Sequence, residues 1–296
     1  MERVLVAGAT GALGRHVLHT LNQRGYYTRA LCRSDARARS ITAHEIVIAD
    51  ALKDNLTPAL ENIDVVFSCL GQTVAANFSI RAPGYLDVDV PANRNLLEAA
   101  RKVNARRFVY VSVLHADMHP KVPYMHAHAI VAKAIRDSGL SYAIIEPTGF
   151  FSAFYAFLDM VRKNQAMVFG DGRACTNPIH DADLAEICAD ALAERNNITI
   201  EAGGPTIYSR QEVIELARSI ARKDVNIRKA PLWVPSLIGK LAQWPAPRIA
   251  DLMGFVHLIS REDFIAPRRG RHELADFYRD QLATPAASAP DCRVRQ

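Results

Sequence analysis

The sequence predicts an α/β fold in which a doubly wound parallel sheet is followed by a smaller α+β region. Near the N-terminus, an apolar run ends in three glycines, Gly8, Gly11 and Gly14, and an amphipathic segment follows at once. Further apolar runs of strand length then alternate with helical patterns, which is the arrangement of successive βαβ units. The 296 residues, 49% of them hydrophobic, are enough to bury one large core.

Composition narrows the class of protein. The formal net charge of +5 suits an anionic small ligand and is far from the footprint of a nucleic-acid binder. The first residues lead directly into a strand rather than a signal peptide, and no apolar run reaches the length of a membrane span. Five scattered cysteines without a C-x-x-C pair are typical of reduced thiols. We therefore expect a cytoplasmic protein with a small-molecule substrate.

The glycine turn points to a ligand. The spacing G-x-x-G-x-x-G lets the backbone turn tightly and approach a pyrophosphate, which the N–H groups at the start of the next helix bind. A plain strand–turn–helix is the alternative, but the motif lies in the context that dinucleotide binding requires. The sequence therefore predicts a Rossmann-like NAD(P)-binding domain over residues 1–150.

The other segments of this domain follow from the same local signals. Gly25 can end the first helix, and Pro91 favours a helix that begins there and continues to Val103, since proline suits the first helical turn. The remaining strands are expected at residues 26–31, 46–49, 64–69, 107–112 and 142–145.

The end of the second strand bears on the choice between NAD and NADP. A dinucleotide domain usually places an acidic residue there to hold the ribose 2′-hydroxyl of NAD. Here Arg33 occupies the place, and its planar guanidinium can bind a 2′-phosphate. Asp35 is the one residue that favours NAD, and a solvated basic loop is the alternative. We expect NADP(H) in preference to NAD(H).

Several motifs occur in the order of a known family. They are residues 6–14 (VAGATGALG), Arg33, residues 64–71 (DVVFSCLG), residues 107–112 (RFVYVS) and residues 146–151 (EPTGFF). With them, residues 3–215 resemble the short-chain dehydrogenase/reductase superfamily in its extended or atypical branch. The nearest group is the NmrA-like NAD(P)H-binding proteins, which is also similar to the 39-kDa subunit of respiratory complex I and to divinyl chlorophyllide reductases.

The resemblance implies a set of cofactor contacts. Those at the pyrophosphate are Gly8, Thr10, Gly11, Ala12, Leu13 and Gly14, and Arg33 faces the 2′-phosphate. Those at the adenine and its ribose are Asp50, Ala51, Cys69, Leu70 and Gly71. Pro147 and Thr148 approach the nicotinamide.

The resemblance also implies a catalytic pair. Typical members carry Tyr-x-x-x-Lys, in which the tyrosine transfers a proton and the lysine lowers its pKa and holds the ribose. Tyr124 matches the tyrosine, but His128 occupies the lysine position. Ser112 is the candidate for holding the substrate oxygen, although the family's serine falls about one residue later. A protonated His128 could replace the lysine; alternatively, the pair has decayed and the protein only binds its cofactor.

Residues 151–282 are expected to form the substrate region, and residues 283–296, rich in Ala, Pro and Ser, a disordered tail. Phe150, Phe151 and Phe154 either roof an apolar substrate pocket or belong to the core. Three local signals complete this region. They are a hairpin turn at Asp171-Gly172, a helix cap at Asp181, and a capping box from Ser209 to Glu212.

Residues 232–244 are apolar and amphipathic and contain both tryptophans of the chain. The simpler interpretation is a wall or lid of the substrate region. The other is weak docking to a membrane surface, helped by the basic run at residues 268–271.

Taken together, the signals favour an NADP(H)-dependent oxidoreductase. Hydride would move between the nicotinamide and a carbonyl or alkene of a small apolar or aromatic substrate, with Tyr124 supplying the proton. No metal is expected, because the histidines at residues 115–128 lack a regular zinc spacing. A catalytically silent sensor, scaffold or assembly factor is one alternative, and a redox-neutral epimerase or isomerase is another. The oligomeric state stays open.

Overall fold

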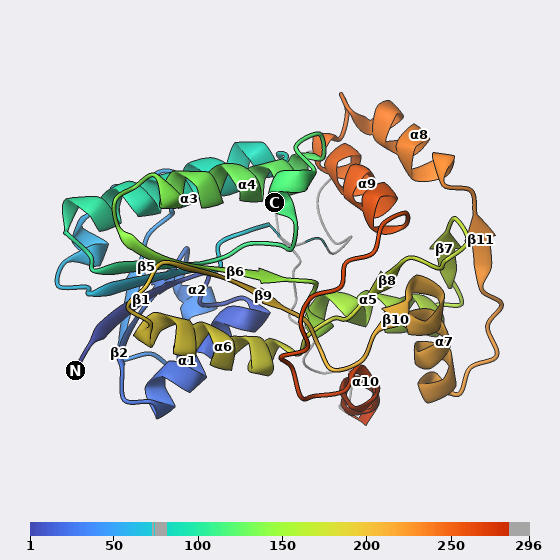
Figure 1. The fold of residues 1–296 in the computed structure, drawn as a ribbon, viewed down its shortest axis with the longest axis horizontal. Helices are drawn as coiled ribbons and strands as arrows, with labels where there is room; N and C mark the ends of the chain where they lie inside the picture. The colour runs from blue at the N-terminus through green and yellow to red at the C-terminus, as the bar shows by residue number, and fades with distance from the viewer. Residues whose placement is uncertain (73, 75–81, 284–296) are drawn as a thin grey trace.

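A seven-stranded parallel sheet of order β3-β2-β1-β4-β5-β6-β9 forms the centre of the protein in a computed structural model, which describes residues 1–72, 74 and 82–283 (Figure 1). The strands are β1 (Arg3–Ala7), β2 (Tyr27–Cys32), β3 (Glu45–Ile48), β4 (Val65–Ser68), β5 (Arg107–Val111), β6 (Ser141–Pro147) and β9 (Ile198–Ala202). Every neighbouring pair is parallel. This confirms the predicted Rossmann-like α/β fold.

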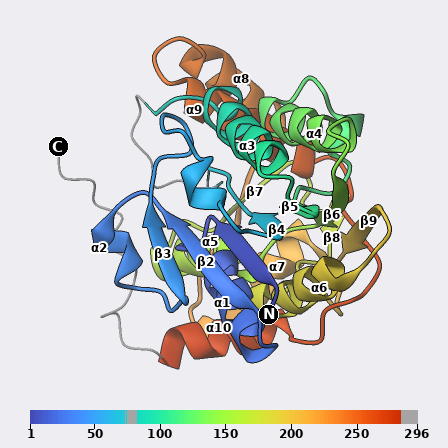
Figure 2. The same ribbon diagram turned by 90° about the vertical axis from the view of Figure 1, so that its left-hand side faces the viewer.

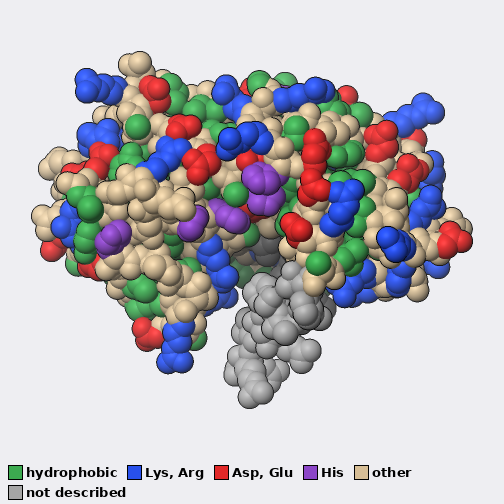
Figure 3. All heavy atoms as spheres, turned by 90° about the horizontal axis from the view of Figure 1, so that it is seen from below, with side chains coloured by type: hydrophobic (Ala, Val, Ile, Leu, Met, Phe, Trp, Pro, Cys, Tyr) green, Lys and Arg blue, Asp and Glu red, His purple; other side chains and the backbone are tan. Residues whose placement is uncertain are grey.

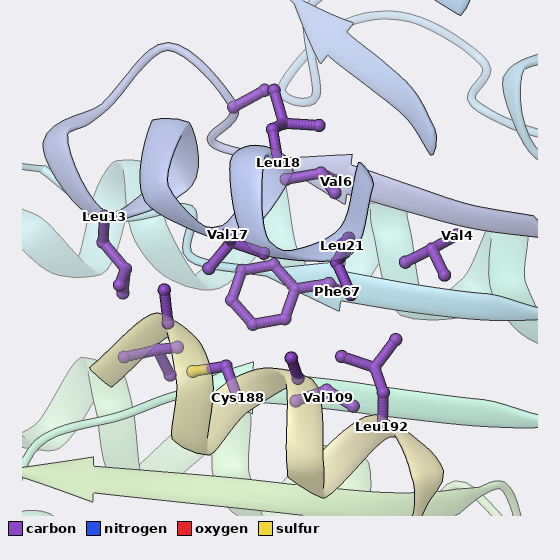
Figure 4. Close-up of a cluster of buried hydrophobic side chains, with 14 of the residues drawn as sticks. Val4, Val6, Leu13, Val17, Leu18, Leu21, Phe67, Val109, Cys188 and Leu192 are labelled. Carbon is purple, nitrogen blue, oxygen red and sulfur yellow. The ribbon is translucent and has the colours of Figure 1, made fainter. Parts of the chain in front are cut away.

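Helices cover both faces of the sheet (Figures 1 and 2). On one face lie α1 (Ala12–Gln23) and α6 (Asp181–Ala193), and on the other α3 (Tyr85–Lys102) and α4 (Pro123–Arg136). The inner strands β1, β4 and β5 are buried on both sides because both sides are covered. In Figure 4, Leu13, Val17 and Leu21 of α1 point toward Phe67 of β4, with Cys188 of α6 beneath. The short segments of this half are α2 (Asp35–Ala38), η1 (Pro58–Leu60) and η2 (Ala116–Met118).

Helix α3 begins earlier than its sequence indicated. It starts at Tyr85, so Pro91 lies inside it rather than in its first turn. The proline is exposed, so its ring disturbs only the solvent side of the helix, where water can take the freed carbonyl. The prediction of a start at Pro91 is therefore wrong.

The sheet extends past residue 150. β9 pairs with β6, and α6 packs on α1, so residues from the second half complete the nucleotide-binding layer. Arg107 of β5 ties this return in place, because its buried guanidinium donates to the carbonyl oxygens of Ala191 and Asn196, each at 3.0 Å. The boundary expected at residue 150 therefore cuts through one sheet instead of separating two units.

The rest of the second half packs around α5 (Phe151–Arg162), α7 (Arg210–Ala221) and α10 (Leu274–Ala283), which share a third apolar core. Two small sheets and two further helices complete it: β7 (Met167–Phe169) with β11 (Arg228–Ala230), β8 (Cys175–Thr176) with β10 (Tyr208–Ser209), α8 (Trp233–Ala242) and α9 (Pro247–Ile259). Among the described residues, no helix has the length and apolar character needed to cross a bilayer. The expected disordered tail lies outside the described residues except for Ala283, which ends α10.

Of the three local signals expected in this half, the structure confirms one. The capping box is confirmed, since the Ser209 hydroxyl accepts from the Glu212 N–H and the Glu212 carboxylate accepts from the Ser209 N–H. The hairpin at Asp171-Gly172 is wrong, because β7 and β8 each pair with a distant strand. The cap at Asp181 is also wrong, since His180 Nδ1 accepts from the Ala182 N–H.

Candidate functional site

The loops that follow β1 and β4 meet where the strand order changes direction. The chain passes from β1 to β2 on one side, while β4 lies on the other, and open α/β sheets bind ligands at such a switch point. The Cys69 N–H donates to the Ala7 carbonyl oxygen at 3.0 Å, which joins the two loops directly. Burial raises the pKa of the Cys69 thiol to about 12, so this residue is an inert spacer.

The glycine turn is a cradle that no side chain could occupy. Gly8 has a φ of +86°, and a Cβ there would lie 2.7 Å from the Cys69 carbonyl oxygen. A Cβ on Gly14 would lie 2.2 Å from the Gly8 carbonyl oxygen. Both clashes involve backbone atoms, which cannot rotate away as a flexible side chain would. Glycine is therefore required for the turn itself and for a close approach by a ligand.

The N-terminus of α1 is suited to an anion. Its N-cap residue, Gly11, makes no side-chain hydrogen bond, and the first turn holds no acidic side chain. The N–H groups of this turn carry the positive end of the helix dipole. The Leu13 side chain points into the core, so only its backbone is available to a ligand. The cradle and the helix end together fit a pyrophosphate.

Arginines flank the cradle on the side of β2. Arg33 is exposed and makes no hydrogen bond or ion pair with the described residues, so its guanidinium is available to a phosphate. Arg15, which the sequence analysis missed, donates from Nε to the Thr10 carbonyl oxygen at 3.2 Å and from Nη2 to Ser40 Oγ at 3.1 Å. Its signal was its position directly after the third glycine.

The two residues expected at the adenine follow β3 and have structural contacts of their own. The Asp50 carboxylate accepts from the Leu52 N–H at 3.0 Å. Ala51 is buried, and its carbonyl oxygen accepts from Asn95 Nδ2 at 2.8 Å. Both lie in the loop that follows an edge strand of the sheet, and their contact with adenine stays a prediction.

Two residues of α3 hold the loop that contains Leu70 and Gly71. Asn93 Nδ2 donates to the Leu70 carbonyl oxygen at 3.1 Å, and the Asp89 carboxylate accepts from the Gln72 N–H at 3.0 Å. Sequence reasoning missed both residues. Their signal was an acid and an amide spaced by four on the face of α3 that packs against the sheet.

The nicotinamide end is formed where β6 stops. Pro147 is buried, and its carbonyl oxygen accepts from the Leu114 N–H at 3.0 Å. The Thr148 hydroxyl donates to the Asn177 carbonyl oxygen at 2.6 Å, which fixes the chain as it leaves the sheet. Both residues lie at the carboxyl ends of the parallel strands, as the cradle does. Their contact with a nicotinamide stays a prediction.

Tyr124 lies in the first turn of α4 and belongs to an aromatic cluster. Its ring centroid is 4.9 Å from those of Tyr85 and His128 and 4.6 Å from that of Phe255. Burial, with the neighbouring Tyr85 and Asp89, raises the pKa of Tyr124 far above its usual value, while the Arg248 guanidinium opposes this rise. This rise makes the hydroxyl a weaker acid than an ordinary tyrosine, so the opposing charge of Arg248 is what favours donation of its proton.

His128 does not supply the charge of the missing lysine. It is buried, and its Nδ1 lies 2.7 Å from the Tyr110 hydroxyl, within hydrogen-bond distance. Burial lowers the pKa of His128 to about 4, so the imidazole is neutral near pH 7. The expectation of a protonated imidazole is wrong, because the protein interior disfavours the charged form. What the structure does provide is an imidazole that packs edge-on against the Tyr124 ring.

Two buried polar atoms near this edge of the sheet lack partners among the described residues. They are Ser112 Oγ, directly after β5, and Asp89 Oδ2 on α3. Burial raises the pKa of Asp89 to about 7, although the Gln72 N–H and the Arg248 guanidinium oppose the rise. Such orphaned atoms are rare in native proteins and call for an explanation, such as an absent water or ion.

Arg248 is the residue that the sequence analysis missed most clearly. It is buried on α9, with its guanidinium carbon 4.4 Å from the centroid of the Tyr85 ring. Through Arg248 and Phe255, α9 from the second half reaches the residues around Tyr124. Its signal was a single arginine in the first turn of a mostly apolar helical segment.

The three phenylalanines expected to bind substrate divide into two kinds. Phe151 and Phe154 are buried in the core formed by α5, α7 and α10. Phe151 packs edge-on against His180 at 5.4 Å, and the Phe154 carbonyl oxygen accepts from the Tyr278 hydroxyl at 3.0 Å. Both rings therefore serve packing in this structure, which corrects their assignment as pocket residues. Phe150 keeps exposed surface.

Histidines gather near the middle of the face that carries α1 and α6 (Figure 3). The His180 ring stacks on that of His272 with centroids 4.6 Å apart, and His272 Nδ1 lies 2.7 Å from an Asp183 carboxylate oxygen. Within the described ranges, no three His, Cys, Asp or Glu side chains converge as metal ligands would. These histidines cap and bridge elements of the second half.

A parallel sheet with a glycine cradle at its switch point defines a dinucleotide-binding α/β protein. The family model described as NAD(P)H-binding matches residues 8–195. The chain belongs to this NmrA-like NAD(P)H-binding family.

Relatives of known name include reductases and assembly factors. The chain is 30% identical over 264 residues to divinyl chlorophyllide a 8-vinyl-reductase of Zea mays, covering 80% of this chain but only 66% of the maize protein. It is 23% identical over 270 residues to the photosystem II assembly factor Ycf39 of Cyanophora paradoxa, covering 88% and 82%. An NADPH-dependent quinone oxidoreductase of Escherichia coli shares the fold, with a TM-score of 0.73, 19% identity and coverage of 95% and 100%.

Proposed function

We propose that this protein is an NADP(H)-dependent oxidoreductase acting on a carbonyl or alkene of a small apolar or aromatic substrate. The observation that carries the proposal is the combination of Tyr124, whose hydroxyl feels the charge of Arg248, with the glycine cradle and the orphaned Ser112 hydroxyl. The name of the maize relative describes reduction of a vinyl group, which is consistent with an alkene substrate.

NADP(H) is the proposed cofactor because of the charge beside the cradle. Arg33 is exposed at the end of β2, where a ribose 2′-substituent would lie, and Arg15 adds a second guanidinium next to the turn. Two cations recognise a phosphate far better than a neutral hydroxyl.

A bound nicotinamide supplies or accepts the hydride. The Tyr124 hydroxyl donates the proton to the substrate during reduction. The Ser112 hydroxyl donates a hydrogen bond to a substrate oxygen. Arg248 supplies the positive charge that offsets the charge left on the tyrosine oxygen, which is the electrostatic part of the lysine's role. His128 positions the Tyr124 ring, and Tyr110 in turn fixes the imidazole.

The test is consumption of NADPH with a panel of quinones, aromatic aldehydes and conjugated alkenes. Tyr124→Phe should lower kcat about a hundredfold or more, the scale of general acid catalysis, while the Kd for NADPH stays unchanged. Tyr142→Phe is the matched control, since Tyr142 lies at the opposite end of β6 from Thr148. The proposal fails if no acceptor oxidises NADPH, or if both variants turn over alike.

A second candidate is a cofactor-binding assembly factor or sensor without turnover. It is favoured by the neutral His128 in the lysine position and by the name of the Cyanophora relative, which is an assembly factor. This candidate predicts tight NADPH binding in fluorescence titrations, no consumption with any acceptor, and no effect of Tyr124→Phe on binding.

A further inference from the structure

Helix α8 carries a concentrated exposed apolar surface. Within the helix, Trp233 and Leu241 are 61% and 72% exposed, and Leu237 and Ile238 are also exposed. Trp244, two residues after the helix, is 95% exposed. Both tryptophans of the chain are among them. In Figures 1 and 2 the helix lies at an extremity of the molecule, outside α9 and away from the central sheet. We call Trp233, Leu237, Ile238, Leu241 and Trp244 the α8 patch.

Helix α8 exposes the apolar face that an ordinary surface helix buries. Its contact with α9 uses small or compact residues, because Pro235 is buried and a Cβ on Gly239 would lie 3.4 Å from the Ala250 carbonyl oxygen. Ser236 Oγ lies 3.1 Å from His257 Nδ1 on α9, which fixes the rotation of the helix. The large apolar side chains therefore face solvent, although a helix normally buries that stripe.

The spacing of the patch makes it continuous. Residues 233, 237 and 241 are four positions apart, so they lie on one face of α8, and Trp244 follows two residues after the helix ends. Single exposed apolar residues need no explanation, but a contiguous patch indicates an interaction surface.

The exposed charges in the stretch that contains the patch are of one sign. No Asp or Glu occurs between Asp224 and Asp251. The exposed cations in this stretch are Lys240 in the helix and Arg228 and Lys229 in β11, which leads into it. An apolar face that carries tryptophans, in a stretch whose exposed charges are lysine and arginine, complements a bilayer interface with anionic headgroups.

We propose that α8 is a membrane-surface anchor that lies in the plane of a bilayer containing anionic lipids. The indoles of Trp233 and Trp244 sit at the headgroup level and Leu237 and Leu241 enter the acyl region, while the three exposed cations contact phosphates. A second copy of the chain fits less well, because a stable dimer buries about 800 Å² on each partner. Four side chains of one ten-residue helix, with Trp244 just beyond it, offer less than this.

The tryptophans give a direct readout with the full chain, because no other tryptophan contributes. We expect a blue shift of their fluorescence on titration with phosphatidylcholine vesicles that contain phosphatidylglycerol, and quenching when the lipids carry bromine in their acyl chains. Vesicles of phosphatidylcholine alone should bind at least about tenfold more weakly, and high salt should weaken the anionic case.

Variants locate the contact. Leu237→Ser with Leu241→Ser keeps both tryptophans and should weaken partitioning about tenfold or more, and Lys240→Glu should reduce it on anionic vesicles only. Ile46→Ser with Ile48→Ser is the matched control, since this exposed apolar pair lies on the edge strand β3. The proposal is overturned by the absence of a shift with either vesicle, by equal loss in the control, or by a dimer that the leucine variant dissociates while no vesicle binds.

Discussion

At the residue scale, Asp89 carries the clearest conflict between burial and charge. One carboxylate oxygen holds the loop after β4 through the Gln72 N–H, while the other has no partner among the described residues. Its raised pKa means that the folded protein binds a proton there that the unfolded chain releases near pH 4. The folded state is therefore stabilised by this group below pH 4, and that stability is lost as the pH rises through about 7.

Asp89→Asn should remove this dependence. The difference in free energy of unfolding between variant and wild type should shift toward the variant by about 2–4 kcal/mol from pH 4 to pH 8, because the amide never ionises. Urea denaturation at several pH values measures it. Glu98→Gln, an exposed change on the same helix, should show a far smaller shift. A difference that stays constant with pH contradicts the assignment.

Arg33 is the residue on which cofactor preference depends. Arg33→Ala should raise the Kd for NADPH about 10- to 100-fold and that for NADH by less than about threefold, since only NADPH loses a charge-assisted contact. Calorimetric titration of both cofactors measures it. Arg37→Ala, an exposed change in the neighbouring helix α2, is the control, and equal losses for the two cofactors would refute the 2′-phosphate role.

At the element scale, the strands expected in the central sheet are confirmed, whereas the hairpin expected between β7 and β8 is wrong. β4 and β5 lie within the residues that their apolar runs indicated, because each run is bounded by local turn residues. The partners of β7 and β8 were misjudged, since each pairs with a strand far along the chain. A turn sequence such as Asp171-Gly172 permits a hairpin, but whether the two strands pair with each other depends on the other strands that are available to them.

The cradle before α1 is the element whose disruption is easiest to test. Gly14→Ala should abolish detectable NADPH binding and lower stability by about 1–3 kcal/mol, because the added Cβ meets backbone atoms at 2.2 Å and 2.8 Å. Thermal denaturation and cofactor titration measure the two effects. Gly254→Ala, where a Cβ meets nothing within 4 Å, should leave binding intact. Normal binding by the Gly14 variant would contradict this account of the cradle.

At the scale of the whole molecule, the two halves of the chain share one fold. α6 shields the apolar cluster that α1 and the sheet form, and β9 covers the edge of β6. Arg107 depends on acceptors from the second half, so removal of that half leaves a buried guanidinium without them.

A fragment of residues 1–150 should therefore not fold by itself. We expect exposed apolar surface, seen as dye binding, and no cooperative thermal transition, because the sheet would lose a strand and one covering helix. The full chain under the same conditions is the control. A cooperative transition in the fragment would restore residue 150 as a true domain boundary.

Local sequence alone determined the Rossmann-like sheet, the glycine cradle and the arginine beside it. Each depends on neighbouring residues: apolar runs set the strands, and Gly8 and Gly14 permit the turn. The catalytic end could not be predicted, because burial and partners distant in sequence decide it. Only the tertiary structure made His128 neutral, turned Phe151 and Phe154 into core, and brought Arg248 to the cluster around Tyr124. The physical reason is that the pKa of a side chain and its access to a ligand depend on everything packed around it, whereas a turn depends on its own backbone.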